Sequence, residues 1–230
     1  MPVPSALIFD LDGTLVDSRA DLTAAVNTVR ASLGLPPHSD VAVGRMIGDG
    51  ARQLLHRALD ADVGPARVDE VFPQFTTAYA AVCTDQTQPY PGVRDLLAWL
   101  AAEHPTLPLA ILTNKPEPMS RQILAHLELA AYFRDVIGGE TLPVRKPDPA
   151  GMHELAARLG LAATDLPRMM LVGDSPVDAR TAAAASCQCA LCYWGFTDAD
   201  VLDAEPADIR AKSVPGLQQA LAARWAAAAH

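Results

Sequence analysis

Short apolar runs alternate with segments of helical periodicity over most of the chain. The apolar runs predict buried strands at 6–11, 108–113, 134–138, 168–173 and 188–193. Segments whose apolar positions recur at helical spacing lie at 93–103, 117–129, 149–160, 176–186 and 214–228. Strands that alternate with helices in this way predict βαβ units, and hence an α/β fold with a doubly wound parallel sheet.

One long stretch departs from the alternation. Between residues 17 and 88 the pattern shows no convincing strand and predicts only helices, at 18–33, 40–47, 50–62 and about 66–85. Ser18 is a candidate N-cap for the first of these helices, and Gly34 a candidate stop. We therefore expect a small all-helical cap domain, residues 17–88, inserted after the first strand of a Rossmann-like core. That core comprises residues 1–16 and 89–230.

The net charge of −9 argues against nucleic acid as the main partner, because phosphate backbones attract basic surfaces. A small phosphorylated metabolite remains compatible, since a divalent cation can supply positive charge locally. No basic leader precedes Ala6, and no apolar run reaches the roughly 20 residues of a membrane helix. These features predict a cytoplasmic protein that does not bind membranes. Both a monomer and a homodimer stay open.

Three of the four cysteines, Cys187, Cys189 and Cys192, lie close together. A zinc site would need a second ligand pair, which the spacing does not provide. If the segment is a strand, Cys189 and Cys192 face opposite sides of the sheet. We expect buried, reduced thiols, and any role beyond packing stays open.

Polar residues follow several of the predicted strands, where an open parallel sheet binds its ligands. Because these strand ends share one edge of the sheet, we expect the polar side chains to converge there. In chain order they are Asp10, Asp12, Thr113, Asn114, Lys146, Asp174, Ser175 and Asp178.

The carboxylates suggest metal-assisted phosphate chemistry. Asp10, Asp12 and Asp174 would repel one another without a cation, and carboxylate oxygens suit Mg²⁺. A carboxylate can attack phosphorus to give an aspartyl-phosphate, which makes Asp10 the candidate nucleophile. Asp12, two residues on, points the same way if the backbone stays extended, and it is the candidate general acid and base.

The remaining polar residues have supporting roles in this interpretation. Thr113 and the backbone N–H groups near it can bind phosphate oxygens, and Asn114 beside it is a further candidate for substrate binding. Lys146 can neutralise both the nucleophile and the transferring group. Asp178, with Ser175, is a candidate for orienting Lys146 or a metal-bound water.

Four segments, DLDGTLVDS, LTNK, RKPDP and GDSPVD, resemble in order the four motifs of the haloacid dehalogenase superfamily, from residue 6 to about 196. The resemblance implies that Asp10 is the nucleophile and that Asp12 is the acid/base, with its backbone carbonyl offered to Mg²⁺. It also implies that Thr113 and Lys146 act on the phosphate and that Asp174 binds the metal. The helical insert resembles the small cap domain of that family.

Within this resemblance, hydrolysis of a phosphate ester is the favoured reaction. Dehalogenases of the namesake type lack an acid at the position of Asp12, and phosphonate hydrolases have alanine there and a cap lysine, whereas no lysine lies between 17 and 88. Related sugar-phosphate mutases carry a histidine after the first motif, and residues 17–22 have none. A phosphosugar mutase and a non-catalytic binding protein remain the lesser alternatives.

The substrate depends on the cap. Residues 46–55, 136–140 and 193–196 resemble bacterial phosphoglycolate phosphatases, which implies 2-phosphoglycolate as substrate. Gly48 and Gly50 would then let the cap backbone approach the substrate, although they also fit a plain helix–helix turn. Arg52 or Arg45 would meet the carboxylate. The alternative is a sugar-phosphate phosphatase, acting for example on an amino-sugar or nucleotide-like phosphate.

Overall fold

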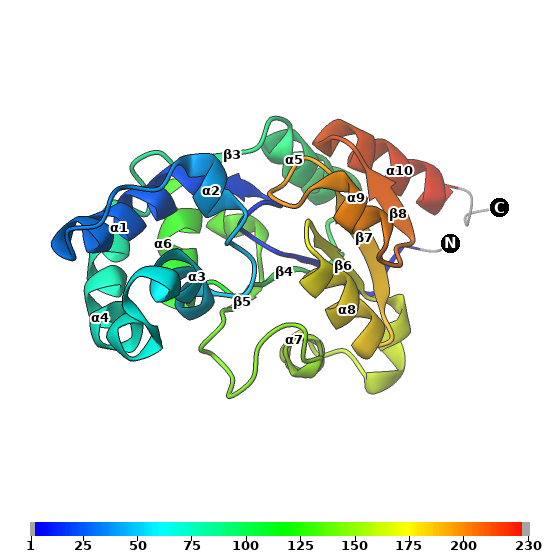
Figure 1. The fold of residues 1–230 in the computed structure, drawn as a ribbon. Coiled ribbons are helices and arrows are strands. Elements are labelled where there is room, and N and C mark those ends of the chain that lie inside the picture. Colours follow the sequence, from blue (N-terminus) through cyan, green and yellow to red (C-terminus); the bar gives the residue numbers. More distant parts are fainter. Residues whose placement is uncertain (1–2, 227–230) are drawn as a thin grey trace.

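The computed structural model describes residues 3–226, and a six-stranded sheet forms its centre (Figure 1). The strands are β1 (Leu7–Phe9), β4 (Leu109–Leu112), β5 (Asp135–Ile137), β6 (Met170–Gly173), β7 (Gln188–Cys192) and β8 (Ile209–Ala211). All neighbours are parallel, in the order β5-β4-β1-β6-β7-β8. The chain therefore winds outward from β1 in both directions, which confirms the predicted doubly wound α/β fold.

Both faces of the sheet are buried. Leu7 and Phe9 of β1 belong to one apolar cluster, and Ile8 between them belongs to the other. The first cluster includes residues of α5 (Val93–Glu103), α6 (Glu117–His126) and α10 (Val214–Ala226). The second includes residues of α7 (Ala150–Arg158), α8 (Pro176–Ala184) and α9 (Ala199–Asp203). Figure 1 accordingly shows α5 and α10 on one side of the sheet, and α7 and α8 on the other.

The cysteines of β7 follow the predicted alternation. Cys189 lies in the second apolar cluster and Cys192 in the first, so the two thiols face opposite sides of the sheet. All four cysteines are free, and Cys187 is only partly buried. Burial raises the pKa of the Cys187 thiol to about 12, so this group stays protonated at neutral pH. These surroundings fit buried apolar side chains better than metal ligands.

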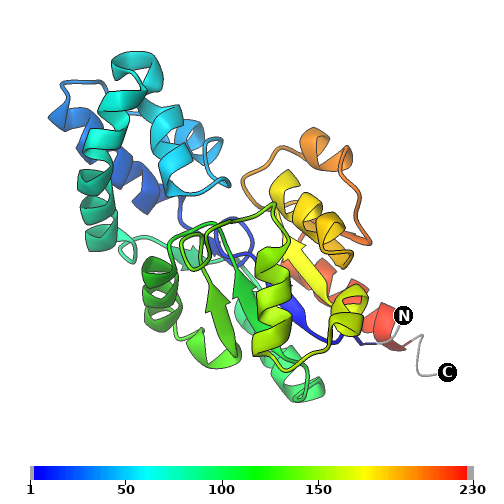
Figure 2. The same cartoon turned by 90° about the horizontal axis from the view of Figure 1, so that it is seen from below.

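Four helices form the insertion between β1 and β4, as predicted: α1 (Arg19–Ser32), α2 (Asp40–Gly44), α3 (Ala51–Val63) and α4 (Pro65–Val82). Figure 2 shows them grouped to one side of the sheet and its covering helices. Buried apolar side chains such as Val29, Leu59 and Phe75 join α1, α3 and α4. Gly34 follows the end of α1 with a φ of 70°, which fits its predicted role as a stop.

The two segments that connect the sheet to the insertion form a pair of strands. β2 (Val16–Asp17) and β3 (Gln88–Pro89) form a short antiparallel ladder, so the prediction of no strand between 17 and 88 is wrong at both ends of that stretch. Strands of two residues carry no periodic signal. The Asp21 carboxylate reinforces the ladder by accepting hydrogen bonds from the backbone N–H groups of Gln86 and Thr87, at 2.9 Å each. The division into residues 1–16 and 89–230 against 17–88 stays a prediction, with both boundaries at this ladder.

The other differences concern short elements. β8, α9 and the 3-10 helices η1 (Ala130–Tyr132) and η2 (Ala163–Arg168) had no counterpart in the sequence prediction, because each spans six residues or fewer. The predicted helix 214–228 is observed to Ala226, and its last two residues lie outside the described range. Within residues 3–226, no helix has the length and apolar character needed to cross a membrane.

Candidate active site

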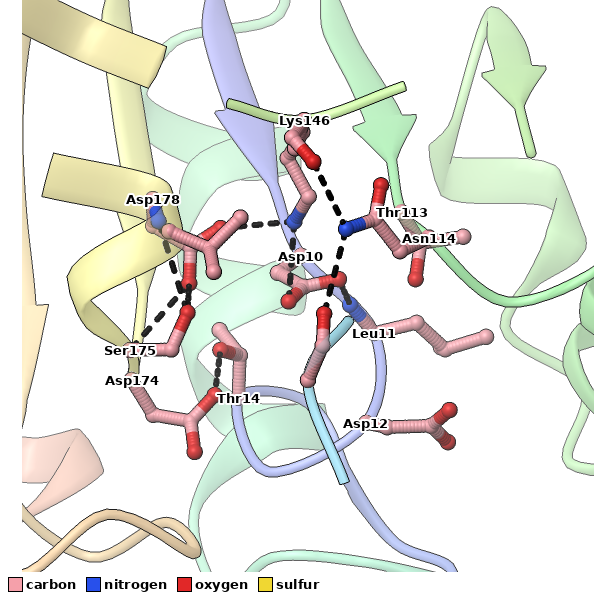
Figure 3. Close-up of polar contacts among 12 residues, drawn as sticks. Asp10, Leu11, Asp12, Thr14, Thr113, Asn114, Lys146, Asp174, Ser175 and Asp178 are labelled. Atoms are coloured by element: carbon pink, nitrogen blue, oxygen red, sulfur yellow. Dashed lines mark hydrogen bonds and ion pairs between the residues drawn. The ribbon is translucent and has the colours of Figure 1, made fainter. Parts of the chain in front are cut away.

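The carboxyl ends of three central strands bring the predicted site residues together (Figure 3). Asp10 follows β1, Thr113 follows β4 and Asp174 follows β6, and β1 pairs with both other strands. This is the point where the strand order reverses, and where an open α/β sheet leaves a crevice. All three side chains are buried. The predicted convergence at one sheet edge is therefore what the structure shows for these residues.

Lys146 joins two of the carboxylates. Its Nζ lies 2.9 Å from Oδ2 of Asp10 and 2.6 Å from Oδ1 of Asp178 (Figure 3). Burial lowers the pKa of Lys146, but attraction to the two carboxylates outweighs that effect and holds the pKa above its usual value. Burial raises the pKa of Asp10, and the nearby Lys146 charge counters it in part. The backbone N–H of Leu11 donates to Oδ1 of Asp10 at 2.7 Å, so both carboxylate oxygens are fixed.

Asp178 is held in turn by the start of α8. Its Oδ2 accepts hydrogen bonds from the Ser175 hydroxyl at 2.6 Å and from the Ser175 backbone N–H at 3.2 Å. This is a capping box, in which a polar side chain three residues into the helix reaches back to the N-cap. The cap geometry therefore orients Asp178, and Asp178 orients Lys146, in line with the prediction for Asp178 and Ser175.

Asp174 lies in a tight enclosure beside this group. Its Oδ1 accepts from the Thr14 hydroxyl at 3.1 Å, and its Oδ2 accepts from the backbone N–H of Phe196 at 2.8 Å. A Cβ atom at Gly13 or at Gly195 would overlap the carboxylate, and Gly13 has a φ of 82° that a side chain would also disfavour. Burial raises the pKa of Asp174 well above its ordinary value, and the charges of Asp178 and Asp10 act in the same direction.

These carboxylates fit a divalent cation. Oxygen atoms of Asp10, Asp174 and Asp178 all lie within 4.8 Å of one another. Lys146 is the one ammonium among them, and no basic side chain within residues 3–226 forms an ion pair with Asp174. The cluster thus carries more negative than positive charge in a buried setting, and hard oxygen donors of this kind suit Mg²⁺.

Asp12 departs from the prediction. Its carboxylate accepts hydrogen bonds from the Lys115 ammonium at 3.0 Å to each oxygen, and from the Ser18 hydroxyl at 2.6 Å. Figure 3 shows it turned away from Asp10 and Lys146. β1 ends at Phe9 and the chain turns at once, so the two-residue strand period does not extend to Asp12. Its carboxylate is therefore absent from the three-acid cluster, which leaves its backbone carbonyl as the candidate metal ligand.

Lys115, Tyr79 and Ser18 had no predicted part in the chemistry, although Lys115 ends the LTNK motif. The Lys115 side chain is buried, and its ammonium contacts both Asp12 and the hydroxyl of Tyr79 from α4. Ser18 occupies the N-cap position of α1, but its side chain makes no capping bond and binds Asp12 instead. The signal for Lys115 was its place directly after Thr113 and Asn114 in that motif.

A pocket of about 570 Å³, which includes space open to solvent, lies above these residues. Its floor includes Asp10, Asp12, Thr113, Asn114 and Asp174. The insertion supplies a mostly apolar wall made of Leu22, Ile47, Ala51, Leu54 and Tyr79, together with Gly48 and Gly50.

Asn114 connects this wall to the floor. Its side-chain amide donates to the carbonyl of Gly48 at 3.1 Å and to the carbonyl of Lys146 at 3.0 Å. Gly50 has a φ of 91°, and a Cβ atom there would lie 3.0 Å from the Asn114 carbonyl. The backbone at Gly48 and Gly50 therefore contacts the floor of the pocket, and its approach to a substrate stays a prediction.

The two predicted arginines lie elsewhere. Arg52 forms an ion pair with Asp69 and stacks over Phe72, with its guanidinium carbon 4.2 Å from the ring centroid. It faces α4 along the outside of the insertion. Arg45 lies 3.9 Å from Asp198, and both side chains are largely exposed. Neither arginine lines the pocket, so the prediction that one of them meets a substrate carboxylate is corrected.

Comparison with known proteins gives the same picture as the geometry. A family described as "Haloacid dehalogenase-like hydrolase" matches residues 7–192. The chain is 39% identical to a phosphoglycolate phosphatase of Pseudomonas putida over 208 residues, which is 88% of this chain and 74% of the relative. It is 40% identical to a phosphoglycolate phosphatase of Rhodospirillum rubrum over 203 residues, covering 85% of this chain and 82% of that one.

Among solved structures, one from Haemophilus somnus, described as a predicted phosphoglycolate phosphatase, superposes with a TM-score of 0.86. The two chains are 28% identical, and the match covers 96% of this chain and 99% of the other. The likeness thus extends over the insertion as well as the sheet.

Proposed function

The chain belongs to the haloacid dehalogenase-like hydrolases, and on this premise we propose that it hydrolyses 2-phosphoglycolate to glycolate and phosphate. One observation carries the reaction type: Asp10 is fixed at the base of the pocket by Lys146 and Leu11, while Asp12 is held separately by Lys115 and Ser18. The carboxyl groups of Asp10 and Asp12 thus have different partners, which suits one as the nucleophile and the other as the acid/base. The names of relatives about 40% identical support phosphoglycolate as the substrate.

In the first half of the proposed reaction, a carboxylate oxygen of Asp10 attacks phosphorus and the bond from phosphorus to the leaving oxygen breaks. Asp12 gives its proton to that oxygen, and the alcohol departs. In the second half, Asp12 takes a proton from water, the water oxygen attacks phosphorus, and the bond to Asp10 breaks. Lys146 neutralises charge beside Asp10 throughout, and Thr113 binds phosphate oxygens.

A magnesium ion is part of this proposal. Asp10 and Asp174 would hold it together with the backbone carbonyl of Asp12, because Asp178 is already engaged by Lys146 and Ser175. The bound ion would offset the excess negative charge and favour binding of the phosphate group. The electrostatic fit of the cluster supports a divalent cation in general, and the resemblance to the family favours magnesium.

Thermal unfolding at different pH values tests the metal site. Without a divalent cation, the raised pKa values of Asp10 and Asp174 mean that the folded chain binds protons more tightly than the unfolded chain. In chelator, the free energy of unfolding is therefore expected to rise as the pH is lowered from neutrality into the range where these carboxyl groups take up protons in the folded chain. Adding MgCl₂ at the higher pH should raise the melting temperature and flatten this dependence.

The matched variant for this experiment is Asp174→Asn, which keeps the shape of the side chain and removes one charge. It should show a weaker pH dependence and a smaller response to MgCl₂ than the unsubstituted protein. A melting temperature that MgCl₂ leaves unchanged in the unsubstituted protein would contradict the proposed metal site.

The lining of the pocket bears on the size of the substrate. The cap side offers mainly apolar side chains, Leu22, Ile47, Ala51 and Leu54, and few hydrogen-bonding groups for sugar hydroxyls. This observation favours a small substrate over the alternative of a sugar phosphate. A phosphosugar mutase or a non-catalytic binding protein has no specific support from the residues that line the pocket.

A panel of phosphate esters tests the substrate directly. We expect kcat/KM for 2-phosphoglycolate to exceed the values for glucosamine 6-phosphate, a nucleoside monophosphate and ethyl phosphate by at least about tenfold. Release of inorganic phosphate under initial-rate conditions is the measurement. Equal turnover of all four esters would refute the substrate assignment and leave phosphatase activity intact, whereas transfer to an added sugar acceptor would indicate a mutase.

A further inference from the structure

Lys115 is the one positively charged side chain that lines the pocket in the part of the chain that the structure describes. Lys146 lies beneath Asp10, between two carboxylates, and does not contribute to the lining. Arg52 and Arg45 are engaged outside it. A substrate that carries a carboxylate as well as a phosphate needs a partner for its second negative charge, because an unpaired charge in a buried site is costly.

We propose that Lys115 recognises the carboxylate of the substrate and so determines the preference for 2-phosphoglycolate. This inference rests on the proposed function and adds to it the residue that discriminates between esters. In the sequence, the only signal for Lys115 was its place after Thr113 and Asn114, and that place does not indicate a contact with a substrate carboxylate.

The size of the substrate places its carboxylate near Lys115. In 2-phosphoglycolate a single methylene carbon separates the leaving oxygen from the carboxylate. Asp12 serves the leaving oxygen in the proposed reaction, and the Lys115 ammonium lies 3.0 Å from each oxygen of Asp12. The Lys115 ammonium, which contacts Asp12, is therefore also within reach of a carboxylate that lies one methylene beyond the leaving oxygen.

The hydrogen-bonding pattern leaves room for this contact. An ammonium has three hydrogens, and in this structure the acceptors are the two oxygens of Asp12 and the hydroxyl of Tyr79. Because two of these three contacts go to the same carboxylate, one can pass to a substrate oxygen while the other keeps the ion pair. The hydrogen bond from Lys115 to the substrate would be charge-assisted, and the apolar wall of the pocket beside it would strengthen this bond.

Tyr79 adds a second donor from the insertion. Burial raises the pKa of its phenol well above the ordinary value, so the hydroxyl stays protonated. Its oxygen accepts from Lys115, which leaves its own hydrogen for an acceptor in the pocket. Lys115 comes from the core and Tyr79 from α4, so a carboxylate bound to both would also connect the two parts of the protein.

Exchange of Lys115 for methionine tests the proposal through a ratio of two substrates. Lys115→Met removes the charge and keeps much of the side-chain volume. We expect the ratio of kcat/KM for 2-phosphoglycolate to that for ethyl phosphate to fall by roughly 30-fold, since only the first ester loses a charged partner. Inhibition by glycolate should weaken by a similar factor. Lys212→Met, at an exposed position after β8, is the matched control and should keep the unsubstituted ratio.

The outcomes separate this inference from the proposed function. If the unsubstituted protein prefers 2-phosphoglycolate and Lys115→Met slows both esters equally, Lys115 serves only Asp12 and the inference is overturned. If the unsubstituted protein shows no preference, the proposed function and the inference fail together. Lys115→Arg guards against a folding defect, because it keeps the charge and should retain most of the preference. Circular dichroism shows whether this variant is folded. Loss of the preference in a folded Lys115→Arg protein would also count against the inference.

Discussion

Replacement of Asp10 by asparagine is expected to lower kcat by at least about 10⁴-fold, because the amide cannot form the covalent intermediate. The change is small in shape, but the two neighbours of Asp10 donate to different carboxylate oxygens, so the amide oxygen can keep only one of these two contacts. These neighbours are the Leu11 backbone N–H and the Lys146 ammonium. Steady-state release of phosphate from 2-phosphoglycolate is the measurement, with trapping of the phosphorylated enzyme as a second one.

Stability provides the control for this variant. Burial raises the pKa of Asp10, which means that its ionised form is unfavourable in the folded chain without a cation. Asp10→Asn should therefore melt at the same temperature as the unsubstituted protein or above it when a chelator is present. Asp200→Asn, at an exposed position of α9, should leave both activity and melting temperature unchanged. Turnover that survives in a folded Asp10→Asn protein would contradict the assignment of the nucleophile.

The parts of this site that lie directly at strand ends could be predicted from sequence. Asp10, Thr113 and Asp174 each follow a run of apolar residues, and parallel strands bring their carboxyl ends to one edge whatever the rest of the chain does. Asp178 was also accessible, because a polar residue three positions after Ser175 at a helix start predicts a capping box. These positions could be predicted because each depends only on residues that are neighbours in the sequence or on adjacent strands of the sheet.

The contacts between core and insertion could not be predicted in this way. Tyr79 lies on α4 and Lys115 follows the end of β4, and only the packing of the insertion on the core brings them together. Periodicity shows which face of a helix is apolar, but not where the helix docks. The same limit explains Arg52, which was a sound candidate by sequence and turns instead toward Asp69. Asp12 differed for another reason, because β1 ends one residue before the motif begins.

Replacement of Lys146 by methionine is expected to affect activity and stability together. The buried ammonium neutralises Asp10 and Asp178, and its removal leaves two carboxylates without a cationic partner. Breaking a buried ion pair from one side typically costs about 3 kcal/mol of unfolding free energy. We expect that loss in chelator by chemical denaturation, and a fall in kcat of at least about 10³-fold because the transferring phosphate also loses a nearby positive charge.

A second substitution separates the two effects of Lys146→Met. Adding Asp178→Asn removes one of the unpaired charges, so the double variant should regain part of the lost stability while its activity stays low. Lowering the pH should also reduce the deficit of the single variant, since the raised pKa of Asp10 lets this carboxyl group take up a proton in the folded state. If Lys146→Met is as stable as Lys212→Met at every pH, the ammonium does not balance the buried carboxylates, and its role would be confined to binding the phosphate.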